Sequence, residues 1–169
     1  MYRLTNSVPY LLNRVGVRMG ELFSRRLAPY NVTLPMYRVL AGLSERGDQR
    51  LSDLSVMTSI ELSTLSRLVS TMKRRGFVSR ARPDANGRTV EINLTSKGRA
   101  LAKTLMPQAA EFERVGTQGF ANVEINMLKQ RLVEIYRNLD ELERRLQDER
   151  DGERPRKSEA SVVTRADAE

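Results

Sequence analysis

The last third of the chain has the most regular pattern of apolar and polar positions. Between residues 122 and 147, apolar side chains recur in steps of three and four residues. They are Ile125, Leu128, Leu132, Ile135, Leu139, Leu142 and Leu146. This a/d pattern predicts a helix, about 39 Å long, whose apolar seam must be covered by another helix. The seam could pack within its own subunit, but the helix is longer than the small domain before it. We therefore predict that this seam forms a subunit interface.

Helical spacing of apolar residues predicts five more helices upstream. These run from Pro9 to Pro29, from Thr33 through Leu43, from Ser52 to about Thr58, from about Leu62 to Arg75, and from Thr95 to an interruption at Pro107. Gly76 is a natural residue to follow a helix, and Thr95 is a natural N-cap.

A β-hairpin is predicted in the stretch "RARPDANGRTVEINLT", residues 80–95. The segment around Asn86 and Gly87 supplies turn chemistry, and the alternation of Val90, Ile92 and Leu94 with polar residues is typical of a half-buried strand. Phe77 and Val78 begin the partner strand. The fold class is therefore mainly α, with a small two- to three-stranded antiparallel sheet. The hairpin tip carries three arginines, which either form a solvated loop or bind something: Arg80, Arg82 and Arg88.

Positive charge is concentrated around this hairpin. The formal net charge of the chain is +8 and its pI is about 10.3. Residues 50–103 alone hold eleven bases and four acids, a net of +7. Such a concentration points to a polyanion, either nucleic acid or an anionic membrane surface.

Several chemistries are excluded by composition. The chain has no cysteine and no histidine, which removes disulfides, thiol redox sensing, typical zinc sites and histidine-based catalysis. The acids form no convergent pair, so we expect neither an enzyme nor a cofactor. No signal peptide core and no apolar run of about 20 residues is present, so we expect a cytoplasmic protein without a membrane partner.

The order of the predicted elements is helix, turn, helix, two-stranded wing, which is a winged helix-turn-helix. In such a unit the second helix enters the DNA major groove and the wing approaches the flanking backbone or minor groove. The predicted DNA-binding residues are Ser63, Thr64, Ser66, Arg67, Lys73, Arg80, Arg82, Asn86 and Arg88. Arg67 is the predicted base reader, because its guanidinium matches guanine bidentately. Ser63 could instead cap the helix, Arg67 could contact only phosphate, and Lys73 could serve the helix C-terminus.

From Leu34 to Leu101 the chain resembles the MarR family of bacterial winged-helix transcriptional regulators. The resemblance lies in "VLAGLSERGDQRLSDLSVMTSIELSTLSRLVSTMKRRGFVSR", the wing "DANGRTVEINLT" and the following "SKGRAL". It places the wing arginine of the family on Arg88, with Asn86 at the position of the usual wing Asp. The resemblance also implies a homodimer built from the N- and C-terminal helices, and hence a pseudo-palindromic operator in double-stranded DNA.

The family usually senses small aromatic or phenolic anions in a cleft between the dimer helices and the winged domain. The candidate effector-binding residues here are Arg14, Arg18, Phe23, Tyr37 and Arg38. An arginine could receive the carboxylate of an aromatic acid or of its CoA thioester. The alternative is that these arginines are solvated or form ion pairs in the dimer.

The predicted organisation has four parts. Residues 1–30 form an N-terminal helix for dimerisation, 31–100 the DNA-binding domain, 101–147 the C-terminal dimerisation helices, and 148–169 a charged, disordered tail. The expected function is that of a homodimeric repressor that a small ligand releases from its operator. The alternative is a winged-helix protein that binds DNA nonspecifically or binds only proteins, without an effector.

Overall fold

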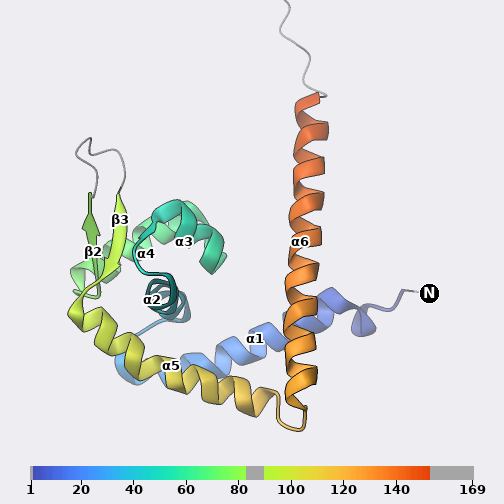
Figure 1. Ribbon diagram of the computed structural model, residues 1–169, viewed down its shortest axis with the longest axis horizontal. Helices are drawn as coiled ribbons and strands as arrows, with labels where there is room; N and C mark the ends of the chain where they lie inside the picture. Colours follow the sequence, from blue (N-terminus) through green and yellow to red (C-terminus); the bar gives the residue numbers. More distant parts are fainter. Residues whose placement is uncertain (1, 83–89, 153–169) are drawn as a thin grey trace, which may run out of the picture. The chain divides into compact units, whose positions relative to one another are not determined.

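The computed structural model describes residues 2–82 and 90–152, and the chain divides into two compact units, Met1–Gln118 and Gly119–Glu169. The first unit contains η1 (Leu4–Asn6), α1 (Val8–Leu27), η2 (Ala28–Tyr30), α2 (Leu34–Arg46), β1 (Gln49–Arg50), α3 (Leu51–Thr58), α4 (Leu62–Arg74), β2 (Val78–Ala81), β3 (Glu91–Leu94) and α5 (Ser96–Gly116) (Figure 1). The second contains α6 (Asn122–Gly152). The predicted fold class, mainly helical with a small antiparallel sheet, is confirmed.

Threonine side chains cap the N-termini of α2 and α5, and a glycine follows α4. The Thr33 hydroxyl accepts from the amide of Met36 at 3.4 Å, and the Thr95 hydroxyl accepts from the amide of Gly98 at 3.0 Å. Both threonines have extended backbone and satisfy an otherwise free amide of the first turn. Gly76 has a φ of +72°, the left-handed conformation that ends a helix and favours glycine.

The sheet has three antiparallel strands in the order β1-β3-β2. In β3 the side chains of Ile92 and Leu94 are buried, whereas Glu91 and Asn93 are only half-buried. Val78 pairs with Leu94 and is also buried. One face of the sheet therefore contributes to the core, as the alternating pattern predicted.

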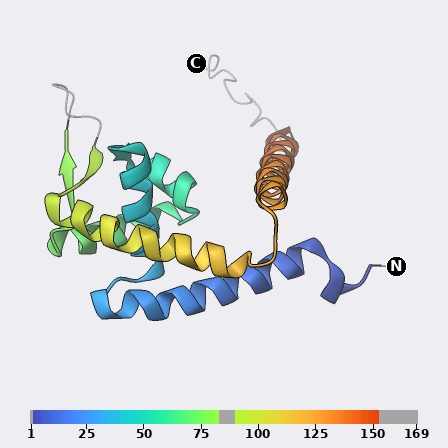
Figure 2. The ribbon, with the colours of Figure 1, turned by 60° about the horizontal axis from the view of Figure 1, so that its bottom comes forward.

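A single hydrophobic core joins the elements of the first unit. Figure 2 shows α1 and α5 side by side, and α2 also packs against α5. The core takes side chains from every helix from α1 to α5 and from strands β2 and β3. Its largest fully buried members are Leu27, Leu40, Leu54, Leu65, Met72, Ile92 and Leu105.

The start of α5 is fixed tightly against the end of α4. A Cβ atom on Gly98 would lie 2.0 Å from the carbonyl oxygen of Phe77, so any side chain there would force the helix away. Thr95 strengthens this junction by donating its hydroxyl to the Gly76 carbonyl at 2.7 Å. The glycine of the "SKG" motif thus allows the close approach that positions the wing relative to α4.

The predicted interruption at Pro107 is wrong, because α5 continues through this residue to Gly116. Proline removes only one amide donor, and the carbonyl that loses its partner belongs to the exposed Lys103. Leu105 is fully buried and Phe112 packs against the core, so apolar contacts on both sides of the proline hold the helix together.

The second unit consists, among the described residues, of α6. This helix extends five residues past its predicted end at Gln147, since "DER" at 148–150 supplies residues compatible with a helix. The predicted boundary of the disordered tail therefore lies inside α6, and the remaining tail, 153–169, lies outside the described residues. No helix in the part of the chain that the structure describes is long and apolar enough to cross a membrane.

Candidate DNA-binding interface and ligand cavity

The turn between α3 and α4 is held by side chains of α3. Ser59 has a φ of +53° and reverses the chain direction. The Ser55 hydroxyl donates to the carbonyl of Ile60 at 2.7 Å, and the buried Thr58 hydroxyl donates to that of Leu54 at 2.6 Å. The Ser55 bond spans the turn between the two helices of the helix-turn-helix, whereas the Thr58 bond lies within α3.

Glu61 caps the N-terminus of α4. Its carboxylate accepts hydrogen bonds from the amides of Ser63 and Thr64, at 2.9 and 3.0 Å, and from the Ser63 hydroxyl. The Ser63 side-chain bond, followed by the two backbone bonds, lowers the pKa of Glu61 from 4.5 to about 2. A fully charged carboxylate therefore stands at the entrance of the predicted recognition helix, where the helix dipole favours it.

The predicted DNA-contacting residues of α4 share its outer surface. Leu65, Val69 and Met72 are buried on the opposite side, and Leu68 is half-buried. The outward residues are Ser63, Thr64, Arg67, Ser70 and Lys73, which are exposed, and Ser66, which is half-buried. The Ser63 hydroxyl is engaged by Glu61, as expected if this residue helps to cap the helix.

A hydrogen bond joins the wing to α4. Arg80 of β2 donates from its Nη2 to the hydroxyl of Ser70 at 3.1 Å, and Ser70 donates to the carbonyl of Ser66 at 2.9 Å. Arg82 follows β2 and is exposed. The remaining predicted wing residues, Asn86 and Arg88, lie outside the described residues.

The positive side chains of this surface have no acidic partner in the described part of the chain. Within residues 2–82 and 90–152, no ion pair involves Arg67, Lys73, Arg80 or Arg82. Their charge is therefore not neutralised within the described part of the chain and is available to a polyanion.

A cavity of about 290 Å³ lies between α1, α2 and α5. It contains three of the predicted effector-binding residues, Phe23, Tyr37 and Arg38, together with Phe112. The Phe23 ring lies edge-on to Tyr37 and Phe112, with centroids 4.8 and 5.3 Å apart. Burial raises the pKa of Tyr37 above 10.0, so its hydroxyl stays protonated at neutral pH. The lining thus combines three aromatic rings and several aliphatic side chains with one hydroxyl and one guanidinium.

A second, open cavity of about 400 Å³ shares Tyr37 and Arg38 with the first. It is also lined by Met57, Thr58 and Ser59, which belong to the end of α3 and the turn before α4. The same two side chains of α2 therefore border both the aromatic cavity and the helix-turn-helix turn.

Arg14 and Arg18 are not brought to the aromatic cavity. Arg14 lies 5.7 Å from the ring centroid of Tyr10, and Arg18 forms an exposed ion pair with Glu21 at 3.6 Å. The cavity takes its α1 residues from positions 16, 19, 20 and 23, which form one stripe of the helix. Residues 14 and 18 lie off that stripe.

Exposed apolar side chains are most numerous on two helices, α1 and α6. On α1 they are Val8, Leu11, Leu12, Val15, Val17 and Met19. On α6 the seam residues Leu128, Leu132, Leu139, Leu142 and Leu146 are exposed, and Ile125 and Ile135 are half-buried. Each helix thus carries an apolar surface that its own unit leaves uncovered.

Comparison with known proteins identifies the family. Residues 21–105, half of the chain, match the family model described as "Transcriptional regulator SarA/Rot". A MarR family regulator from Silicibacter pomeroyi has a crystal structure that superposes with a TM-score of 0.74 at 26% identity, over 80% of this chain and 91% of that one. The chain belongs to the MarR family of transcriptional regulators.

Two further relatives of this MarR-family chain carry functional descriptions. The HTH-type transcriptional repressor IacR of Pseudomonas putida is 27% identical over 79% of this chain and 80% of its own. BpsR of Bordetella bronchiseptica has the same fold, with a TM-score of 0.72 and 24% identity over 80% of this chain and 97% of its own. The DNA binding of BpsR is regulated by 6-hydroxynicotinic acid.

Glu61 and Phe112 are site residues that were not predicted from the sequence. Glu61 lies two positions before Ser63 and directly before an apolar-periodic run. An acidic residue at such a position is a signal for a capping side chain, so the sequence could have identified Glu61. Phe112 could not be assigned to the site because the predicted helix ended at Pro107. Once the helix continues, the spacing of Leu105, Ala109 and Phe112 places all three on one side.

Proposed function

We propose that this MarR-family protein is a homodimeric repressor that binds a pseudo-palindromic operator and leaves it when an aromatic carboxylate binds. The observation that carries the proposal is the outer surface of α4 and β2. Small hydroxyl side chains there surround Arg67, and Arg80 and Arg82 lie nearby without acidic partners among the described residues. This combination suits a helix that enters a groove and a wing that binds phosphates.

The roles of the individual DNA-binding residues follow from their positions. Arg67, in the middle of the exposed face, is the proposed base reader. Thr64 and Ser66 contact base edges or phosphate, while Ser63 contributes mainly by binding Glu61. Arg80, Arg82 and the wing residue Arg88 neutralise phosphates or enter the minor groove. Asn86, which is uncharged, orients Arg88. Lys73 contacts the flanking backbone.

A dimer is supported by the two uncovered apolar surfaces. The a/d residues of α6 continue over three heptads. In a single chain the leucines of this seam are 37–57% exposed to water, and a second helix would bury them. A second copy of the same helix offers the same spacing. Two recognition helices related by a twofold axis would then read an inverted repeat.

The aromatic cavity supports an aryl carboxylate as the effector. Its aromatic rings, packed edge to face, form part of the cavity wall. Arg38 can form a bidentate pair with a carboxylate, and the Tyr37 hydroxyl can donate a hydrogen bond. A volume of about 290 Å³ is at the lower end for ligand sites, which favours a free acid over the larger CoA thioester. Regulation of the fold-related BpsR by 6-hydroxynicotinic acid is consistent with this class.

Tyr37 and Arg38 offer a physical link from ligand to DNA. A ligand that moves these side chains also changes the lining of the second cavity, at Thr58 and Ser59. These two residues shape the turn that sets the position of α4, so the ligand would favour a different orientation of the recognition helix.

The test is release of a bound duplex by small acids. Full-length protein is bound to a duplex enriched from a genomic library, and fluorescence anisotropy follows its release by aryl carboxylates. The matched aryl carboxamides, which lack the charge, are the controls. We expect that at least one acid releases the duplex and that its amide does not. Release by both compounds of every pair would contradict the role of Arg38, and binding without any preferred duplex would contradict the repressor itself.

A further inference from the structure

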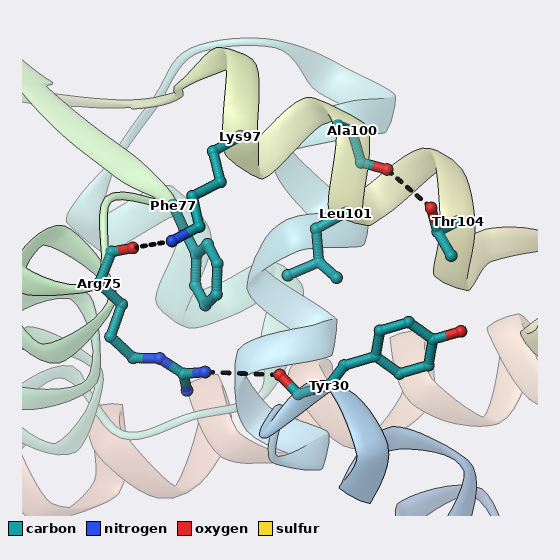
Figure 3. Close-up of a pocket in the computed structure, with 7 residues that line it drawn as sticks. All are labelled: Tyr30, Arg75, Phe77, Lys97, Ala100, Leu101 and Thr104. Carbon is teal, nitrogen blue, oxygen red and sulfur yellow. Dashed lines mark hydrogen bonds between the residues drawn. The ribbon is translucent and has the colours of Figure 1, made fainter.

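A pocket of about 420 Å³ opens between the end of α4, the first turns of α5 and the η2 turn (Figure 3). It shares no residue with the aromatic cavity at Tyr37. Two cations, Arg75 and Lys97, line it together with the aromatic rings of Tyr30 and Phe77. Among the described residues that line it, none is acidic.

Both cations are held beside the same ring. The Arg75 guanidinium carbon lies 4.7 Å from the Phe77 ring centroid, and the Lys97 ammonium lies 5.2 Å from it. Within the described ranges, neither side chain forms an ion pair. Two like charges without a carboxylate create a positive potential that an anion would relieve.

Main-chain carbonyls fix the two cations in position. Nη1 of Arg75 donates to the carbonyl of Asn31 at 2.5 Å, and Nη2 lies 3.5 Å from that of Tyr30. Lys97 donates to the carbonyl of Arg75 at 3.1 Å. A guanidinium has five N–H groups and an ammonium has three, so donors remain on both side chains after these bonds.

The stability of α5 does not explain the position of Lys97. This residue lies in the first turn of the helix, where the dipole disfavours a positive charge. Arg75 does have a structural role, because its bond to Asn31 ties the end of α4 to the connection between α1 and α2. Lys97 has a structural role as well, because it donates to the carbonyl of Arg75, the C-cap residue of α4, where the helix dipole favours a positive charge.

The remaining walls are suited to a flat ring. Figure 3 shows the side chains of Phe77, Leu101 and Tyr30 around the opening, and Thr104 turned back to donate to the carbonyl of Ala100 at 3.1 Å. The apolar surfaces thus face the space beside the two cations. A planar aromatic group would cover them while an attached anion reaches the N–H donors.

We propose that this pocket is a binding site for a small planar aryl carboxylate, with the carboxylate at Lys97 and Arg75 and the ring against Leu101 and Tyr30. The site is separate from the proposed effector cavity, and binding to it requires neither DNA nor the repressor function.

The experiment uses full-length protein without DNA and benzoate as the probe, titrated by saturation-transfer NMR. Lys97→Met removes the charge and keeps the stem, and Lys103→Met makes the same change on the same helix outside the pocket. Ala100→Phe fills the pocket without changing charge. These three positions are exposed, and a thermal melt checks that each variant is folded.

Lys97→Met is expected to weaken a benzoate-binding component about tenfold, since a charge-assisted hydrogen bond is lost. Ala100→Phe should abolish the same component, and Lys103→Met should leave it unchanged. Arg38→Met, in the other cavity, should leave it unchanged as well.

Three results would overturn the site. They are equal effects of Lys97→Met and Lys103→Met, loss of all benzoate binding in Arg38→Met, and binding of benzamide as tight as that of benzoate. Displacement of benzoate by inorganic phosphate at equal concentration would also overturn the aromatic assignment, because it would indicate a simple anion site.

Discussion

Arg80 of the first wing strand donates a hydrogen bond to the hydroxyl of Ser70 on α4, at 3.1 Å. Ser70 in turn donates to the carbonyl of Ser66 one turn earlier, so its hydroxyl is engaged as both acceptor and donor. Arg80 keeps further N–H donors for a ligand. The contact thus orients a wing arginine with respect to the proposed recognition helix.

Removing the Ser70 hydroxyl should weaken DNA binding only through Arg80. We expect Ser70→Ala to lower the affinity for the operator about threefold, in the range of one exposed hydrogen bond. In an Arg80→Met background the same substitution should have no effect. Anisotropy titrations of the four proteins measure this coupling, with Ser44→Ala on α2 as the control. Equal losses in both backgrounds would indicate that Ser70 itself contacts DNA.

Glu61 should stabilise α4 in its charged form. Its pKa is lowered from 4.5 to about 2, so this stabilisation is complete well above pH 4.5 and is lost as the pH falls from 4.5 towards 2. Glu61→Gln should therefore lower the melting temperature at pH 7, and the difference from the wild type should shrink below pH 4.5. Glu143→Gln, an exposed change on α6, is the control. An NMR titration of the Glu61 carboxyl with a midpoint near 4.5 would contradict the cap.

Arg67 should determine one base pair in each half-site. Arg67→Ala is expected to remove about 1–3 kcal/mol of discrimination at that base pair, while other positions keep their preference. The measurement compares affinities for duplexes with single substitutions. Arg74→Ala is the matched control, because Arg74 is exposed on the same helix and donates to Thr71. If Arg67→Ala weakens binding to every duplex equally, the residue contacts only phosphate.

Arg38 should govern release by an aromatic acid. Arg38→Met is expected to raise the acid concentration needed for release of DNA about tenfold, through loss of a charge-assisted pair. Arg18→Met is the control on α1, since Arg18 is paired with Glu21 outside the cavity. Because the pKa of Tyr37 is raised above 10.0, the release concentration should not change between about pH 7 and 9 through titration of this residue. Equal effects of the two arginine variants would exclude the cavity as the effector site.

The seam of α6 should hold the dimer together. Leu139→Glu places a charge at an a position in both subunits, and each lost leucine contributes about 1.5–3 kcal/mol. The dimer dissociation constant should therefore rise about a hundredfold or more. Sedimentation velocity measures it, with Gln130→Glu as the control because that residue lies opposite the seam. An unchanged dimer in Leu139→Glu would require a different interface.

The fold followed from local signals that act over a few residues. Thr95 and Gly76 marked helix ends through capping and φ preferences, and both predictions are confirmed. The helix was wrongly predicted to be interrupted at Pro107. Tertiary contacts outweigh the local cost of a proline inside the helix, and these contacts cannot be read from a local sequence pattern. Helix α6 ended too early in the prediction because charged residues continue a helix as readily as they form a tail.

Only those site residues that lie on one face of a single helix could be predicted from the sequence. The exposed surface of α4 follows from the spacing of Leu65, Val69 and Met72. The aromatic cavity joins three helices, so Phe23, Tyr37 and Arg38 could be nominated but Arg14 could not be separated from them. The pocket at Arg75 and Lys97 joins segments more than twenty residues apart and has no sequence motif.

Specific, dimeric DNA binding is tested most directly by selection of bound duplexes from a random library with full-length protein, at about 0.15 M salt, where nonspecific binding is screened. We expect enrichment of an inverted repeat with half-sites about one helical turn, ~10 bp, apart. Recovery of bound DNA without an enriched motif would contradict a specific dimeric regulator, and charge alone would then account for binding.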